Sequence, residues 1–375
     1  MAATALQLAT APQAPRGAQL DRFLNLGRQP PWAGRIPAHG SLTVIGHPGS
    51  GAEEAVRLIG QAEHGPSLPI LLDARHHGDR TALVGALAER ILQGLLGGEA
   101  IRRWRAGEPP PADTLASLGS ARSAEIARLL TEPEGQVVSL AQLLELPPQG
   151  VTLAITWAHL LAERPLGKVL WELRACVTNE RNVALILGTF PATKDFLLGE
   201  QAALFGVGEK LEMTDPTTER WRELVHVRGL PVTDQDLLWL LLRTDGQARA
   251  TAQILEMSRS DAPDAKWAAR QVWEQESEHA LARAQDTVSF ARAVNPHGVA
   301  LVSAIAADEK PYRALRPYAD AKQIARALGQ LAYHGLIYSP RRGLWLLGDP
   351  LLRDALTNLD PQPSIAPDLP PSSGR

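Results

Sequence analysis

Ser41-Leu-Thr-Val-Ile-Gly-His-Pro-Gly-Ser-Gly-Ala-Glu-Glu54 is the stretch that decides the fold. Residues 41–45 are mostly apolar or β-branched and predict a short buried strand, and the residues from 52 onward predict a helix. Gly46, Gly49 and Gly51 lie between the two elements. A strand, a glycine loop and a helix in this order predict an α/β unit whose loop lies at the carboxyl edge of a parallel sheet. Sheets of this kind bind their ligands at that edge.

Gly46 and Gly51 have the G-x-x-x-x-G spacing of a Walker A phosphate-binding loop. In that motif a Lys and a Ser or Thr follow, and they hold the phosphates and Mg²⁺. Here the two positions are Ala52 and Glu53. Glu53 places a fixed negative charge in the first turn of a helix, where an anion would otherwise bind. We therefore expect weak or no ATP binding and no hydrolysis. An alternative interpretation stays open, in which the loop is a simple tight connection between a strand and a helix in an unrelated α/β fold.

The composition bounds the class of protein. The chain has 375 residues, of which 45% are hydrophobic, so it can form a core and more than one domain. The net charge of -3 excludes a chain-wide attraction for nucleic acid, and any basic surface must be local. One cysteine, Cys176, excludes an internal disulfide and a cysteine metal cluster. No apolar run reaches the length of a membrane span, and we expect a cytoplasmic protein with no membrane contact.

Alternating elements indicate a parallel sheet in the first half of the chain. Apolar, β-rich runs occupy residues 42–45, 70–73, 151–156 and 183–188, and helical patterns occupy residues 52–59, 80–96 and 166–179. Nearly continuous apolar strands that alternate with helices are typical of a parallel sheet covered on both faces. Asp73, with Glu53 or with the neighbouring His76 and His77, could supply metal ligands. Adjacent loop residues rarely converge on one ion, so we expect no metal site.

The order of these elements resembles the P-loop ATPases of the AAA+ and STAND type, especially the prokaryotic group related to origin-recognition ATPases. The resemblance covers residues 40–357. Residues 69–75 are similar to the family's second strand, 151–159 to its Walker B strand, 183–190 to its sensor-1 strand, and 202–213 to the segment that leads into its last strand. It implies a P-loop NTPase-like core with a parallel sheet, followed by a helical lid and a winged-helix domain.

The departures from the family's pattern concern its catalytic groups. The family's Walker B strand ends in Asp-Glu, where this chain has Thr156-Trp157, and the family's arginine after a later glycine is replaced by Val207. Phosphoryl transfer depends on positioning and charge neutralisation, and losing one preorganised group costs about 3–4 kcal/mol. We therefore expect no catalytic residue. Gly46, Gly49, Gly51, Ala52, Glu53 and Arg249 are interpreted as a vestigial nucleotide site, and Arg249 fits the family's Gly-x-x-Arg sensor-2 motif.

The chain divides into five predicted regions. Residues 1–36 are a flexible, mildly basic arm, 37–212 the ATPase-like core, 213–285 a helical lid, 286–358 a winged helix, and 359–375 a disordered Pro-rich tail. In the winged helix, an amphipathic helix begins after Asp320 and ends at Gly335, and a hairpin with Arg341 and Arg342 at its tip follows. Residues 290–357 contain nine Lys or Arg and five Asp or Glu, an excess of four positive charges.

A winged helix binds duplex DNA by placing its third helix in the major groove, and the wing tip contacts the backbone. The candidate DNA-binding residues are Lys322, Gln323, Arg326, Gln330, Arg341 and Arg342. Many winged helices are instead protein-interaction modules, and this alternative stays open.

The leading hypothesis is a non-catalytic AAA+/STAND-like protein that binds duplex DNA. It would act as an assembly or adaptor subunit, with other protein subunits, in a DNA-transaction, mobile-element or defence system. No cofactor is expected beyond weak ATP binding, and homo- and hetero-oligomers are both open. The alternatives are an ATP-binding signalling ATPase of the STAND type with a non-standard nucleotide site, and a purely protein-binding scaffold.

Overall fold

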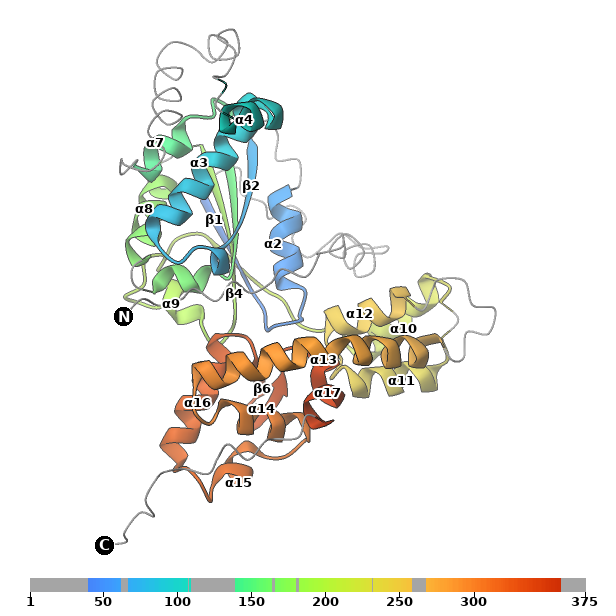
Figure 1. Ribbon diagram of the computed structural model, residues 1–375. Coiled ribbons are helices and arrows are strands. Elements are labelled where there is room, and N and C mark those ends of the chain that lie inside the picture. Colours follow the sequence, from blue (N-terminus) through green and yellow to red (C-terminus); the bar gives the residue numbers. More distant parts are fainter. Residues whose placement is uncertain are drawn as a thin grey trace, which may run out of the picture. The chain divides into compact units, whose positions relative to one another are not determined.

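The computed structural model describes residues 40–61, 67–106, 108, 139–163, 166–179, 182–230, 232–257 and 268–358 (Figure 1). The predicted arm at 1–36 and tail at 359–375 lie outside these residues. The chain divides into two compact units. The first comprises residues up to 46 and 51–213, and the second comprises residues 47–50 and 214 onward. By their contacts, the four residues at the tip of the glycine loop therefore group with the second unit.

The first unit is built on a five-stranded parallel sheet, as the alternating pattern predicted. Its strands are β1 (Gly40–Ile45), β2 (Leu68–Asp73), β3 (Val151–Thr156), β4 (Val183–Thr189) and β5 (Glu209–Glu212), in the spatial order β2-β3-β4-β1-β5. Every residue of β3 and β4 is buried, because helices cover both faces of the centre of the sheet. At the edge, β5 buries only Leu211.

The helices divide between the two faces of this sheet (Figure 1). Helix α2 (Ala52–Gln61) packs on one face with Val44, Ala154 and Ile186. On the other face, Ile155 and Leu187 join a larger core with α3 (Arg80–Leu96), α7 (Leu140–Glu145) and α8 (Gly167–Thr178). The unit also contains α4 (Gly98–Arg105), α9 (Lys194–Leu198) and the short 3-10 helices Ala74–His76 and Ala158–Ala162. Helix α2 follows β1 on one face and α9 follows β4 on the other, so the connections of these adjacent strands diverge at the carboxyl edge, and this is where such sheets form a ligand crevice.

The second unit is helical apart from one hairpin. It contains α10 (Thr218–Val227), α11 (Asp234–Arg243), α12 (Ala248–Met257), α13 (Ala268–Val294), α14 (Gly298–Ala306), α15 (Pro311–Leu315) and α16 (Ala321–Tyr333). The hairpin of β6 (Ile337–Arg341) and β7 (Leu344–Leu347) follows, and the 3-10 helix Pro350–Leu352 and α17 (Arg353–Asn358) complete the unit. Leu301, Leu328 and Ile337 are members of one core that joins α13, α14, α16 and the hairpin.

The predicted ends of α16 are confirmed. Asp320 accepts a hydrogen bond from the Gln323 backbone N–H, and the Gln323 side chain accepts one from the Asp320 N–H, which is a complete capping box. Such a cap contributes about 1 kcal/mol. Gly335 follows the helix with φ +68°, the left-handed conformation that glycine adopts without strain.

No helix in the described part of the chain combines the length and the apolar composition needed to cross a membrane.

Two helix glycines of the first unit provide a matched test of this packing. A Cβ added at Gly60 in α2 would stand 2.4 Å from the Ala154 Cβ on β3, whereas a Cβ at Gly85 in α3 would meet nothing within 4 Å. We expect Gly60→Ala to lower the free energy of unfolding by about 1–3 kcal/mol through overpacking. Gly85→Ala should raise it by about 0.5–1 kcal/mol through helix propensity. Chemical denaturation of both variants measures this, and two changes of the same sign would contradict the packing of α2 on β3.

Candidate functional site

The glycine loop joins β1 to α2 with two residues in the left-handed region. Gly49 has φ +84° and Gly51 has φ +87°, and residues with a side chain rarely adopt these conformations. Within the loop, the Ser50 N–H donates to the His47 carbonyl at 3.0 Å, so this amide is already used by the turn. Ser50, Gly51 and Ala52 are buried.

His47 anchors the tip of the loop in the second unit. Its ring stacks on Tyr338 of β6, with centroids 4.1 Å apart and an interplanar angle of 4°. Its Nε2 lies 2.7 Å from Oδ2 of Asp215. The other oxygen of Asp215 accepts the backbone N–H of Ala248 at the start of α12. One carboxylate therefore holds both the loop tip and the first turn of a helix.

Gln247 closes against the backbone of the loop. A Cβ at Gly49 would stand 2.2 Å from Gln247 Oε1, and the φ of +84° already disfavours a side chain at this position. The Gln247 amide donates to the Leu347 carbonyl at 2.8 Å and to the Tyr338 hydroxyl at 3.3 Å, and its side chain is buried. Burial raises the pKa of the Tyr338 phenol well above its usual value, so this hydroxyl stays neutral.

The structure brings Arg249 to the loop through its backbone. The Arg249 N–H donates to the Gly49 carbonyl at 2.8 Å. A Walker A loop uses its backbone and its lysine to cradle phosphates. Here the tip of the loop is instead packed against a glutamine, an aromatic stack and a helix start. Sequence reasoning missed His47, Asp215 and Gln247, because their pairing joins positions far apart in the chain and no local motif marks it.

The first turn of α2 carries negative charge only. It contains Glu53 and Glu54, and Ala52 occupies the position of the motif's lysine. The N-terminus of a helix attracts anions, and carboxylates in the first turn compete with a phosphate for that field.

The other strand ends carry an aromatic and cationic cluster. Trp157 follows β3 with φ 57° and ψ 35°, a left-handed conformation that costs a bulky residue about 1–2 kcal/mol. The Arg75 guanidinium lies 4.6 Å from the centre of the Trp157 ring, and the Phe190 ring meets the same tryptophan edge-on at 4.6 Å. At the strand end where the resembled family has its acids, this chain thus has a hydroxyl and an indole.

Asp73 forms an ion pair with Arg75. The Arg75 Nε and Nη2 reach the two carboxylate oxygens in a bidentate pair, with the shortest contact at 2.6 Å. Burial raises the pKa of Asp73, but hydrogen bonds and charge from Arg75 outweigh this effect, so its pKa lies below the ordinary value. The pair therefore stabilises the fold at neutral pH, and the contribution is lost as the pH falls through the folded-state pKa.

The described residues contain no group of three histidine, cysteine, aspartate or glutamate side chains that could hold a metal ion. The pKa of His77 lies below its ordinary value. Burial and the charge of His76 lower this pKa, and the nearby Asp73 carboxylate only partly offsets them.

The candidate DNA-binding residues lie on α16 and the hairpin. Lys322 and Arg326 are exposed and one turn apart, so they share a face of the helix. Gln323 is exposed, but its side-chain oxygen serves the capping box. Gln330 is partly buried and accepts a hydrogen bond from Asn295 at 2.6 Å. The two glutamines are therefore engaged within the protein, and the two cations are not.

Arg341 and Arg342 stand at the exposed tip of the hairpin, as predicted. Gly343 turns the chain with φ +81°, and the Ser339 hydroxyl donates to the Arg341 carbonyl at 2.8 Å. These contacts fix the backbone of the turn and leave both guanidinium groups facing solvent.

Ion pairing separates the cations of the second unit into two groups. Within the described residues, eight exposed cations of this unit make no ion pair. One is Arg292 on α13, and the other seven lie on α15, its flanks, α16 and the hairpin: Lys310, Arg313, Arg316, Lys322, Arg326, Arg341 and Arg342. Elsewhere in the unit, six arginines are each paired with a carboxylate: Arg220, Arg222, Arg228, Arg243, Arg283 and Arg353. The C-terminal part thus presents positive charge that its own acids do not neutralise. The three cations around α15 were not among the predicted DNA-binding residues.

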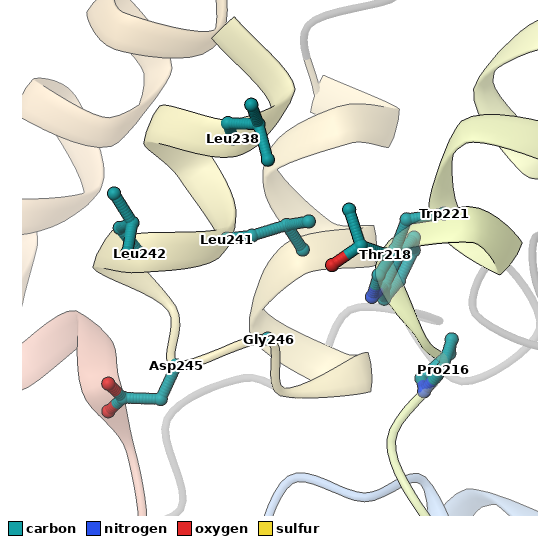
Figure 2. Close-up of a pocket in the computed structure, with 8 residues that line it drawn as sticks. All are labelled: Pro216, Thr218, Trp221, Leu238, Leu241, Leu242, Asp245 and Gly246. Atoms are coloured by element: carbon teal, nitrogen blue, oxygen red, sulfur yellow. The ribbon is translucent and has the colours of Figure 1, made fainter. Parts of the chain in front are cut away.

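A pocket of about 370 Å³ lies between α10 and α11 in the same unit (Figure 2). Its lining is mostly apolar and includes Pro216, Trp221, Leu238 and Leu242. In Figure 2 the Asp245 carboxylate points away from these side chains, and it pairs with Arg353 at 2.6 Å. Apart from Asp245, the polar side-chain groups of the lining are the Thr218 hydroxyl and the Trp221 indole N–H, so no charged group of the lining points into the pocket to bind the phosphates of a nucleotide.

No protein-family model matches the sequence, and no curated protein matches it. Among solved structures, the chain is similar to the Walker-type ATPase PABY2304 of Pyrococcus abyssi, with 17% identity, coverage of 91% of this chain and 94% of that one, and a TM-score of 0.55. It also matches the ORC1 protein of Aeropyrum pernix in complex with DNA, with 16% identity, coverage of 94% and 95%, and a TM-score of 0.41. The ORC2 protein of Aeropyrum pernix gives 15% identity, 91% coverage of each chain and a TM-score of 0.44.

The first match shows that the chain has the fold of a Walker-type ATPase. At their TM-scores the other two support no inference. The expected P-loop NTPase-like core with a parallel sheet is therefore confirmed as a fold.

His47 offers a test of the anchored loop tip. We expect His47→Ala to lower the free energy of unfolding by about 1–3 kcal/mol, because it removes an aromatic stack and a hydrogen bond to a carboxylate. His47→Phe keeps the stack and should lose less. His226→Ala is the control, since His226 is exposed on α10 in the same unit. If the two alanine variants unfold at the same denaturant concentration, the anchor contributes nothing.

The loop also generates a prediction about nucleotides. Titration of Mg²⁺–ATP into the full chain, followed by calorimetry, should show weak or no binding, because the lysine is missing and the first turn of α2 is acidic. A dissociation constant in the micromolar range would contradict this prediction and would favour a signalling ATPase with a non-standard site.

Proposed function

We propose that this protein is a non-catalytic member of the AAA+/STAND-like class that binds duplex DNA through residues 286–358, arranged as a winged helix. The observation that carries the proposal is the segregation of its cations. Lys322, Arg326, Arg341 and Arg342 are exposed and unpaired among the described residues, while six arginines elsewhere in the unit are paired. Unneutralised, clustered positive charge is the electrostatic footprint of a phosphate-binding surface.

The element order supports a specific docking geometry. Helices α14, α15 and α16 are followed by the β6–β7 hairpin, the order of helices and wing in which the third helix enters the major groove. On α16, the face with Lys322 and Arg326 also includes Gly329, where a Cβ would meet nothing within 4 Å. A small residue there lets the helix approach base edges closely. The hairpin arginines would then contact the backbone beside the groove.

The ATPase-like core is assigned an assembly role in this proposal. Its strand ends carry Thr156 and Trp157, and the first turn of α2 is acidic, so phosphoryl transfer lacks the charges it needs. Without those charges, the core would serve as a binding surface for other proteins. The chain would then act as a subunit or adaptor in a multi-protein DNA-transaction, mobile-element or defence system. Co-purification from the native host, with bound nucleic acid and proteins identified, tests this role, and recovery of the chain alone would contradict it.

DNA binding is tested with paired variants in the full chain. We expect the wild type to bind a blunt duplex of random sequence with a steep dependence on salt. Arg341→Ala with Arg342→Ala should reduce the slope of log K against log salt by about 2, since each phosphate contact contributes about 0.9. Lys322→Ala with Arg326→Ala should weaken binding at every salt concentration.

The control for both variants is Arg102→Ala with Arg103→Ala, an adjacent exposed pair on α4 of the first unit. It removes the same charge and should leave binding unchanged. Wild-type affinity in both second-unit variants would refute the assigned interface and would favour the protein-binding scaffold.

A further inference from the structure

The segment Lys310–Tyr318, which includes α15, interleaves cations with exposed aromatic rings. Its sequence is Lys-Pro-Tyr-Arg-Ala-Leu-Arg-Pro-Tyr, and it contains no acid. Tyr312 and Tyr318 are 43% and 65% exposed, among the most exposed large rings of the described residues. Lys310, Arg313 and Arg316 are exposed, and none makes an ion pair with a described residue.

The backbone of this segment is well fixed. Pro311 and Leu315 are buried, and Leu315 belongs to the core shared by α14 and α16. The Tyr318 N–H and the Ala319 N–H both donate to the Leu315 carbonyl, at 2.9 and 3.0 Å. With its apolar residues facing inward, the segment presents its tyrosines and arginines to solvent on a scaffold that is ordered before any ligand arrives. Binding to such a scaffold costs little conformational entropy.

The chemistry of these side chains selects the ligand. Three cations without acidic partners favour a polyanion. The exposed tyrosine rings favour a ligand with accessible flat ring faces on which they can stack. In a duplex, the faces of the paired bases are covered by the neighbouring base pairs. Unpaired bases expose those faces, and aromatic side chains that stack on them beside a basic track are the usual means of binding single strands.

The position of the segment links it to the proposed duplex surface. Helix α15 packs against α16, and only residues 316–320 separate the two helices. A strand that leaves a duplex held by α16 would pass beside α15.

We infer that the segment Lys310–Tyr318 binds an unpaired nucleic-acid strand adjacent to the duplex, with Tyr312 and Tyr318 stacked on bases and Arg313 and Arg316 on phosphates. This inference rests on the proposed function and deepens it: the preferred substrate is a junction of duplex and single strand. Each stacked base contributes a factor of about 5 to 150 in affinity.

The test compares three labelled probes by fluorescence anisotropy with the full chain: a blunt duplex, the same duplex with a single-stranded tail, and the tail alone. The wild type should prefer the tailed duplex over the blunt one by about tenfold or more, as expected for at least one stacked base. Tyr312→Ala with Tyr318→Ala should abolish that preference without changing affinity for the blunt duplex. Tyr312→Phe with Tyr318→Phe keeps the rings and should retain it, which separates stacking from hydrogen bonding by the hydroxyls.

The arginines give an independent readout. Arg313→Ala with Arg316→Ala should lower the salt slope for the tail alone by about 1.4, since a contact to a single strand contributes about 0.7. The Arg102→Ala with Arg103→Ala variant again serves as the control.

The outcomes separate this inference from the proposed function. Equal affinity for blunt and tailed duplex, or a preference that survives the loss of both rings, overturns the inference and leaves duplex binding intact. Binding of the tail alone that needs the tyrosines, without duplex binding, upholds the stacking site and overturns the proposed function. No binding to any of the three probes overturns both.

Discussion

Burial of both faces of the parallel sheet is the constraint on which the first unit depends. Strands β3 and β4 have no exposed residue. Each of their side chains must therefore be apolar or carry a hydroxyl that forms a hydrogen bond within the protein. Polar chemistry is then confined to the carboxyl edge, where the strands end and the backbone turns. The residues at that edge decide what the fold can do, and a change of a few side chains there alters function without disturbing the core.

At this edge the side chains that follow β2, β3 and β4 contact one another. Arg75 is held by Asp73 and covers the Trp157 ring, and the left-handed tryptophan is retained at an energetic cost. A strained backbone conformation of this kind persists only where the surrounding packing holds the residue in place. Gly49 and Gly51 have the left-handed conformations of a tight loop, while the His47 ring stacks on Tyr338 and Gln247 packs on Gly49. The glycine spacing therefore predicts the conformation of the loop, whereas nucleotide binding depends on the side chains around it.

In the second unit the distribution of charge is more informative than its total. The net excess of positive charge is small, but six arginines of this unit are paired with acids, whereas the cations of α15, α16 and the hairpin are exposed and make no ion pair with a described residue. Exposed cations without partners cost little to keep in water and are available to a polyanion. In the proposed function, the two exposed tyrosines of the α15 segment add to this charged surface a means of distinguishing unpaired from paired bases.

The sequence by itself determined the elements and their ends. Apolar runs and helical periodicity placed strands β1 to β4 and the main helices, and Asp320 and Gly335 marked the ends of α16. The alternation of elements indicated the parallel sheet, because these signals are local and follow from backbone geometry. Only the tertiary structure decided which polar groups meet. The pairing of His47 with Asp215, the closure of Gln247 on Gly49, and the engagement of Gln323 and Gln330 within the protein join residues through space. It also decided which cations are neutralised, since an ion pair depends on where two side chains end after the whole chain has packed.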